Sequence, residues 1–228
     1  MNIQDIKDHY LSPKYNGSSL FELWLSKSEV GSSIVPSIYI EEYKEIITKF
    51  LYKYIKADYS PILSIGSGVG CIEKILFHKY KNIYCIDVLP DAVERLLNYG
   101  IKAKTIDIFS LDINSMDKQE LIYLDGTVGH LFENFSTTAS NNQLFAKIFY
   151  ILSNILKKNC YIIFSDDVPF NNKNFEMHSS QLYIRVSDNF FVSQVERYGF
   201  IVQELFHYSY FRPQIGNVLR RIICIKKP

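Results

Sequence analysis

The sequence predicts an α/β fold in which helices cover a mostly parallel sheet. From residue 61 onward, strand-like apolar runs such as 62–65 and 121–124 alternate with segments whose apolar residues have helical spacing. Such alternation is typical of parallel strands joined by crossover helices. The chain has 228 residues, 47% of them hydrophobic, which is enough for one large core. We therefore expect a single α/β domain with additions.

Each element follows from its local pattern. The stretch PILSIGSGVG (61–70) combines a buried strand with a glycine turn, and Cys71 begins a helical pattern directly after it. Pro90 begins the next helix, which Gly100 ends. The other expected elements are strands at 82–87, 101–106, 121–124 and 161–164, helices at 141–158 and 188–198, and a closing strand pair at 200–206 and 218–225.

The first 56 residues lack this alternation. Residues 38–55 have apolar side chains at helical spacing, and residues 20–25 suggest a shorter helix before them. We therefore divide the chain into a helical N-terminal extension, residues 1–56, and a sheet domain, residues 57–228. The aromatic residues of the extension either pack in the core or form a lid over the functional site.

Charge and composition exclude several classes of partner. The net charge is +1, and no block of like charges suggests a nucleic-acid surface. No signal peptide or bilayer-spanning apolar run is visible. The four cysteines, at positions 71, 85, 160 and 224, form no C-x-x-C pair, as expected for reduced thiols. We expect a cytoplasmic protein without a membrane or nucleic-acid partner, and the oligomeric state stays open.

The glycine turn predicts a binding site for a small polar ligand. Gly66, Gly68 and Gly70 lie between a strand and a helix, where backbone N–H groups and a helix N-terminus point at one spot. Asp87 ends the next strand, about 20 residues downstream, where a carboxylate accepts both hydroxyls of a ribose. A dinucleotide fingerprint would need a glycine at Cys71. The spacing therefore favours a nucleoside without a pyrophosphate.

These motifs together resemble a known family. LSIGSGVG, IYCIDV, KTIDIF and LIYLDGTVGHL, in this order, are similar to the motifs of class I S-adenosylmethionine-dependent methyltransferases of the small-molecule branch. The likeness covers roughly residues 60–226 and includes the closing strand pair. It implies a Rossmann-like, mostly parallel seven-stranded sheet with an antiparallel last strand, helices on both faces, and S-adenosylmethionine as cofactor.

The resemblance also implies which residues bind the cofactor. The glycine turn would take the backbone side of the cofactor, Asp87 the ribose, and Asp107 with Ile108 the adenine. Residues 125–130 would border the methionine arm and the acceptor. Members of the family usually carry an acidic residue where this chain has Ser64. The predicted cofactor-binding residues are Ser64, Gly66, Ser67, Gly68, Gly70, Asp87, Val88, Asp107, Ile108, Asp125 and Gly126.

Catalytic residues are harder to predict. His130 follows the strand at 121–124, where it could act as a general base or anchor a loop. Asp125 and Asp166 complete the candidate catalytic set. With Asp167 they resemble the carboxylate cluster of catechol-type methyltransferases, in which oxygen ligands suit magnesium. We expect no metal, and instead one aspartate that lines the acceptor pocket or caps the following turn.

Three functions remain open. The first is a methyltransferase that acts on a small molecule in specialised metabolism. The second is a cyclase or lyase, similar to azetidine-2-carboxylate synthases, that releases methylthioadenosine from the same cofactor. The third is a catalytically silent binding module, because a fold alone does not determine a function.

Overall fold

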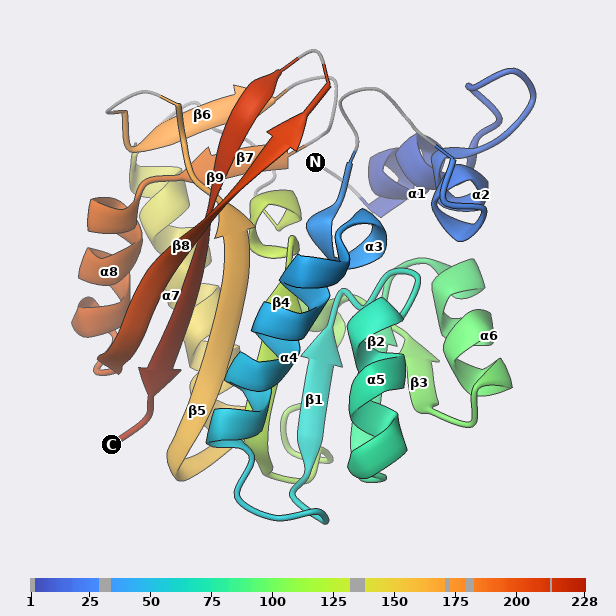
Figure 1. Cartoon of the computed structure of the whole chain (residues 1–228). Coiled ribbons are helices and arrows are strands. Elements are labelled where there is room, and N and C mark those ends of the chain that lie inside the picture. The colour runs from blue at the N-terminus through green and yellow to red at the C-terminus, as the bar shows by residue number, and fades with distance from the viewer. Residues whose placement is uncertain (1–2, 29–33, 132–137, 171–172, 179–182, 214) are drawn as a thin grey trace.

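The computed structural model describes residues 3–28, 34–131, 138–170, 173–178, 183–213 and 215–228. A seven-stranded sheet with the order β3-β2-β1-β4-β5-β9-β8 forms its centre (Figure 1). The strands are β1 (Ile62–Ile65), β2 (Ile83–Asp87), β3 (Lys102–Thr105), β4 (Gln119–Asp125), β5 (Leu156–Asp167), β8 (Ile201–Arg212) and β9 (Gly216–Lys226). The strand pairs of this sheet are parallel except for the two that β9 forms, with β5 and with β8. The predicted seven-stranded sheet with an antiparallel last strand is therefore confirmed.

Helices cover both faces of the sheet. The helices are α4 (Glu41–Tyr54), α5 (Cys71–Lys79) and α6 (Pro90–Asn98), together with α7 (Thr138–Ile155) and α8 (Asp188–Arg197). Side chains alternate along β1, so Ile62 packs with α4, α5 and α6, whereas Leu63 and Ile65 pack with α7 and α8. Both layers are closely packed apolar cores, and they fix the carboxyl ends of the strands in place.

Three further helices lie beyond the carboxyl ends of β1 and β2 (Figure 1): α1 (Ile3–Leu11), α2 (Leu20–Leu25) and α3 (Pro36–Tyr39). A reciprocal capping box between Ser19 and Glu22 begins α2. Its buried side chains, Trp24 among them, pack against Val69 and Leu89 of the sheet domain. By contrast, α4 shares a core cluster with β1. The division of the chain after residue 56 stays a prediction.

Two parts of the chain differ from the sequence-based expectations. The helix predicted over 141–158 ends at Ile155, because Leu156 pairs with Gln119 of β4 and so begins β5. A second, antiparallel sheet of β6 (Phe175–His178) and β7 (Tyr183–Val186) was not predicted. Short 3₁₀ turns, η1 (Ile108–Ser110) and η2 (Val128–His130), follow β3 and β4. Within the described ranges, every helix is too short or too polar to cross a bilayer.

Candidate functional site

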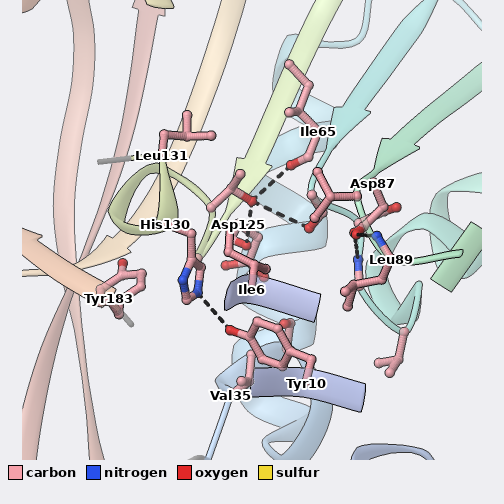
Figure 2. Close-up of a pocket in the computed structure, with 18 of the residues that line it drawn as sticks. Ile6, Tyr10, Val35, Ile65, Asp87, Leu89, Asp125, His130, Leu131 and Tyr183 are labelled. Carbon is pink, nitrogen blue, oxygen red and sulfur yellow. Dashed lines mark hydrogen bonds between the residues drawn. The ribbon is translucent and has the colours of Figure 1, made fainter. Parts of the chain in front are cut away.

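A pocket with a cavity volume of about 210 Å³ lies at the carboxyl ends of β1, β2 and β4. The glycine turn and the segments after β2, β3 and β4 line it from the sheet domain. Side chains of α1, α2 and the segment leading into α3 line it from the N-terminal part of the chain, as Ile6, Tyr10 and Val35 show in Figure 2. Arg212 and Arg220 reach it from the closing strands.

The glycine turn between β1 and α5 requires its glycines. Gly66, Gly68 and Gly70 have φ values of +71°, +52° and +74°, in the left-handed region. A Cβ atom on Gly66 would lie 2.3 Å from Thr127 Oγ1, and one on Gly70 would lie 2.7 Å from Leu96 Cδ2. Gly68 instead faces open space and lines the pocket. The turn therefore packs tightly on one side and leaves its backbone accessible to a ligand on the other.

Asp87 ends β2 and holds the glycine turn in place. Its two carboxylate oxygens accept hydrogen bonds from the backbone N–H groups of Gly68, at 2.8 Å, and Leu89, at 2.9 Å. Figure 2 labels Asp87 and Leu89. The side chain is buried and lines the pocket. Burial raises the pKa of Asp87, and the backbone donors oppose this effect. Each oxygen has a further lone pair with which it could accept a ligand hydroxyl.

Most of the predicted cofactor residues line the same pocket. They come from the glycine turn and from the segments after β2, β3 and β4: Gly66, Ser67, Gly68, Asp87, Val88, Asp107, Ile108, Asp125 and Gly126. Asp107 also caps η1, because its carboxylate accepts a hydrogen bond from the backbone of Phe109 at 3.1 Å. Gly70 does not line the pocket. It is the N-cap residue of α5 and packs closely against Leu96.

Ser64 and Glu73 form a buried pair beside the turn. Ser64 does not line the pocket, and its hydroxyl donates to Glu73 Oε1 at 2.6 Å. Glu73 lines the pocket, and burial raises the pKa of its carboxyl group to about 7. Ser64 is among the predicted cofactor-binding residues, whereas Glu73 is not. A signal was present, because Glu73 lies between the apolar residues Ile72 and Leu76 on the buried face of its helix.

Arg220 lies between two of the aspartates that the sequence analysis grouped together. It forms ion pairs with Asp125 and, at 2.8 Å, with Asp167. Arg212 pairs with Asp167 at 2.9 Å. Burial alone would raise the pKa of Asp167, but the two guanidinium groups hold it below its usual value. In the described part of the chain, no three His, Cys, Asp or Glu side chains are grouped as metal ligands.

Asp166 lies behind the pocket wall. Alternation along β5 directs it away from the face that carries Ser165 and Asp167. It accepts a hydrogen bond from the hydroxyl of Tyr183 at 2.9 Å, and Tyr183 lines the pocket. Burial raises the pKa of Asp166 to about 7. The catalytic role of Asp166 stays a prediction, and the residue of this pair that lines the pocket is Tyr183.

His130 connects the sheet domain to α1. Its Nε2 atom lies 2.8 Å from the hydroxyl oxygen of Tyr10. A dashed line marks this hydrogen bond in Figure 2. The His130 ring also contacts Tyr183, with 4.9 Å between ring centroids, and Tyr10 contacts Trp24 at 5.1 Å. These four side chains, which we call the aromatic row, all line the pocket: Trp24, Tyr10, His130 and Tyr183. The row places a titratable imidazole in a mainly aromatic wall.

Comparison with known proteins gives one informative relative. Models of known protein families give no match. A curated protein described as a tabtoxin biosynthesis enzyme, from Pseudomonas amygdali pv. tabaci, is 28% identical over 232 residues. The alignment covers 98% of this chain and 89% of the relative. The similarity therefore extends over both sequences and includes the N-terminal helices.

Solved structures with the same fold are numerous. Magnesium protoporphyrin IX methyltransferase from Synechocystis, with bound SAH, superposes with a TM-score of 0.70 at 13% identity, covering 99% of each chain. The [4+2]-cyclase SpnF superposes with a TM-score of 0.62 at 12% identity, covering 88% of this chain and 85% of its own. The fold is therefore that of class I S-adenosylmethionine-dependent methyltransferases.

Proposed function

We propose that this protein is an S-adenosylmethionine-dependent methyltransferase that acts on a small molecule in specialised metabolism. The observation that carries the proposal is the convergence of the glycine turn and Asp87 in one pocket at the carboxyl ends of the strands. The tabtoxin biosynthesis relative supports a role in specialised metabolism.

The pocket fits the parts of the proposed cofactor. The open space at Gly68 lets a ligand approach the backbone, and Asp87 supplies carboxylate oxygens for a ribose. In this assignment the adenine lies near Asp107 and Ile108, and the methionine arm extends toward Asp125 and Gly126. The matching chain segments all line the pocket.

The aromatic row suits the chemistry of methyl transfer. When bound, S-adenosylmethionine supplies a methyl group on a cationic sulfonium, which an acceptor nucleophile takes, leaving S-adenosylhomocysteine. Aromatic faces stabilise such a cation and exclude water. His130 would take the proton that a protonated acceptor loses, at the Nε2 atom now hydrogen-bonded to Tyr10. The acceptor would therefore have to displace the Tyr10 hydroxyl from His130, or pass its proton to His130 through that hydroxyl.

The surroundings of the pocket support a small acceptor. Side chains of α1 and α2 line the pocket beyond the carboxyl ends of the strands, so we assign the N-terminal extension the role of a lid. The net charge of +1 gives no support to a nucleic-acid partner. The four cysteines are free thiols, which supports a cytoplasmic location in the proposal.

Ring closure on the cofactor is a second candidate, favoured by the Ser64–Glu73 pair. Glu73 lines the pocket with a pKa of about 7, so it could accept a proton from an amine. In this reaction the amine nitrogen of the methionine arm bonds to its own γ-carbon, the bond from that carbon to sulfur breaks, and methylthioadenosine leaves. The amine proton passes to Glu73, and the product is azetidine-2-carboxylate.

Product analysis separates the two reactions. We expect purified protein with S-adenosylmethionine alone to give only background nucleoside release. Addition of a small-molecule extract as acceptor source should give S-adenosylhomocysteine, because methyl transfer needs a second substrate. Chromatography of the nucleosides measures both. Rapid formation of methylthioadenosine from the cofactor alone would contradict methyl transfer and favour ring closure.

A further inference from the structure

Glu73 is a buried carboxyl group without a basic partner in the described part of the chain. Only 4% of the residue is exposed, and the hydroxyl of Ser64 is the side-chain group that hydrogen-bonds to it. No Lys, Arg or His side chain of the described ranges forms an ion pair with it, whereas Asp125 and Asp167 both pair with Arg220. A buried carboxylate is costly unless it is paired. Because Glu73 lines the pocket, a ligand could supply the missing positive charge.

The surroundings of Glu73 also favour a cation. After burial, the charges of Asp125 on β4 and Asp87 on β2 also contribute to raising its pKa to about 7, although Asp125 is itself paired with Arg220. The other titratable groups that interact with Glu73 are neutral when protonated: Cys71, Cys85 and Tyr123. On α4, the buried Lys44 is already paired with Glu41 at 2.6 Å. Asp87, which forms no ion pair within the described ranges, is therefore the neighbour that adds negative charge beside Glu73.

We infer that Glu73, positioned by Ser64, binds the primary ammonium group of the ligand in this pocket. This inference rests on the proposed function, under which the group is the α-ammonium of the methionine arm. Position 64 carries no acidic side chain. Glu73 of α5, nine positions later in the chain and hydrogen-bonded to Ser64, would supply the carboxylate instead. The inference assigns the role to a residue that no sequence motif indicated.

The arrangement makes binding depend on pH. Below about pH 7 Glu73 is mostly protonated in the ligand-free protein, so its attraction for an ammonium group is lost as the pH falls through its pKa. Above that value the carboxylate is charged and the attraction is restored. Affinity for an ammonium-bearing ligand should therefore rise with pH across this range.

Calorimetry with two nucleosides tests the inference. S-adenosylhomocysteine carries the ammonium group, and 5′-methylthioadenosine lacks the whole amino-acid arm. We expect Glu73→Gln to weaken binding of S-adenosylhomocysteine by about 10- to 100-fold, because a charge-assisted hydrogen bond is lost. Binding of 5′-methylthioadenosine should be unchanged, which also shows that the variant is folded. The matched control is Glu94→Gln, which removes the same charge from the exposed face of α6.

The pH profile gives a second readout. Wild-type affinity for S-adenosylhomocysteine should rise between about pH 6 and about pH 7.5, and the rise should be absent in Glu73→Gln and for 5′-methylthioadenosine. Equal weakening of both nucleosides, or unchanged affinity for both, would overturn the inference. Failure of the wild-type protein to bind either nucleoside would instead overturn the proposed function.

Discussion

Replacement of Asp87 with alanine is expected to weaken binding of S-adenosylhomocysteine by about 100- to 10,000-fold. Two charge-assisted hydrogen bonds to the ribose would be lost, each contributing about 1.5–3 kcal/mol. Alanine also leaves the backbone N–H groups of Gly68 and Leu89 without their carboxylate acceptor, so the glycine turn should loosen as well. Calorimetry measures the affinity, and urea unfolding measures the change in stability.

Asp87→Asn separates the two effects. Asparagine has the same size and keeps one acceptor oxygen, so we expect a smaller loss of stability and a loss of affinity of about 10- to 100-fold. Asp91→Asn, on the exposed face of α6, changes the net charge equally and should have no effect. Unchanged affinity in both Asp87 variants would show that the ribose does not bind there.

Local patterns were sufficient to predict the main sheet. The apolar runs, the glycine turn and the signals at Pro90 and Gly100 predict the strands and most helices in the right order. The end of α7 was missed because Leu156 fits a helical pattern equally well, and only its pairing with Gln119 makes it a strand residue. The hairpin of β6 and β7 carries no comparable turn signal.

Some residues of the candidate site could likewise be predicted from the sequence, and others could not. Residues next to strand ends, such as Asp87 and Asp107, could be predicted because parallel strands bring their carboxyl ends together. Glu73, Tyr10 and Arg220 could not, because each reaches the pocket through tertiary contacts between distant elements. The sequence does contain one hint of Arg220. A basic residue in a buried strand usually has a buried acidic partner, so its position in an apolar strand indicates an ion pair.

Replacement of His130 with asparagine is expected to lower turnover by about 100- to 10,000-fold while the affinity for S-adenosylhomocysteine stays unchanged. When an acceptor must lose a proton to react, removal of the general base lowers the rate by a factor of this size. Tyr10→Phe removes only the hydroxyl that contacts His130 Nε2, so it should lower turnover by about tenfold, as for the loss of one neutral hydrogen bond. Turnover is measured as S-adenosylhomocysteine formed with the acceptor extract.

His207→Asn is the matched control for His130. His207 lies on β8, outside the pocket lining, and its Nε2 atom is 2.8 Å from Asp188 Oδ2. We expect full turnover in this variant. Full turnover in His130→Asn would assign His130 the role of a loop anchor, and an equal loss of cofactor affinity would place it in binding.

Calorimetry on the wild-type protein shows most directly whether this pocket binds an S-adenosyl nucleoside. Separate titrations with S-adenosylhomocysteine and with NAD compare a nucleoside that has no pyrophosphate with a dinucleotide that has one. We expect one site per chain for S-adenosylhomocysteine and no measurable binding of NAD, because position 71 is cysteine and the turn closes at Gly70. Tighter binding of NAD than of S-adenosylhomocysteine would contradict it.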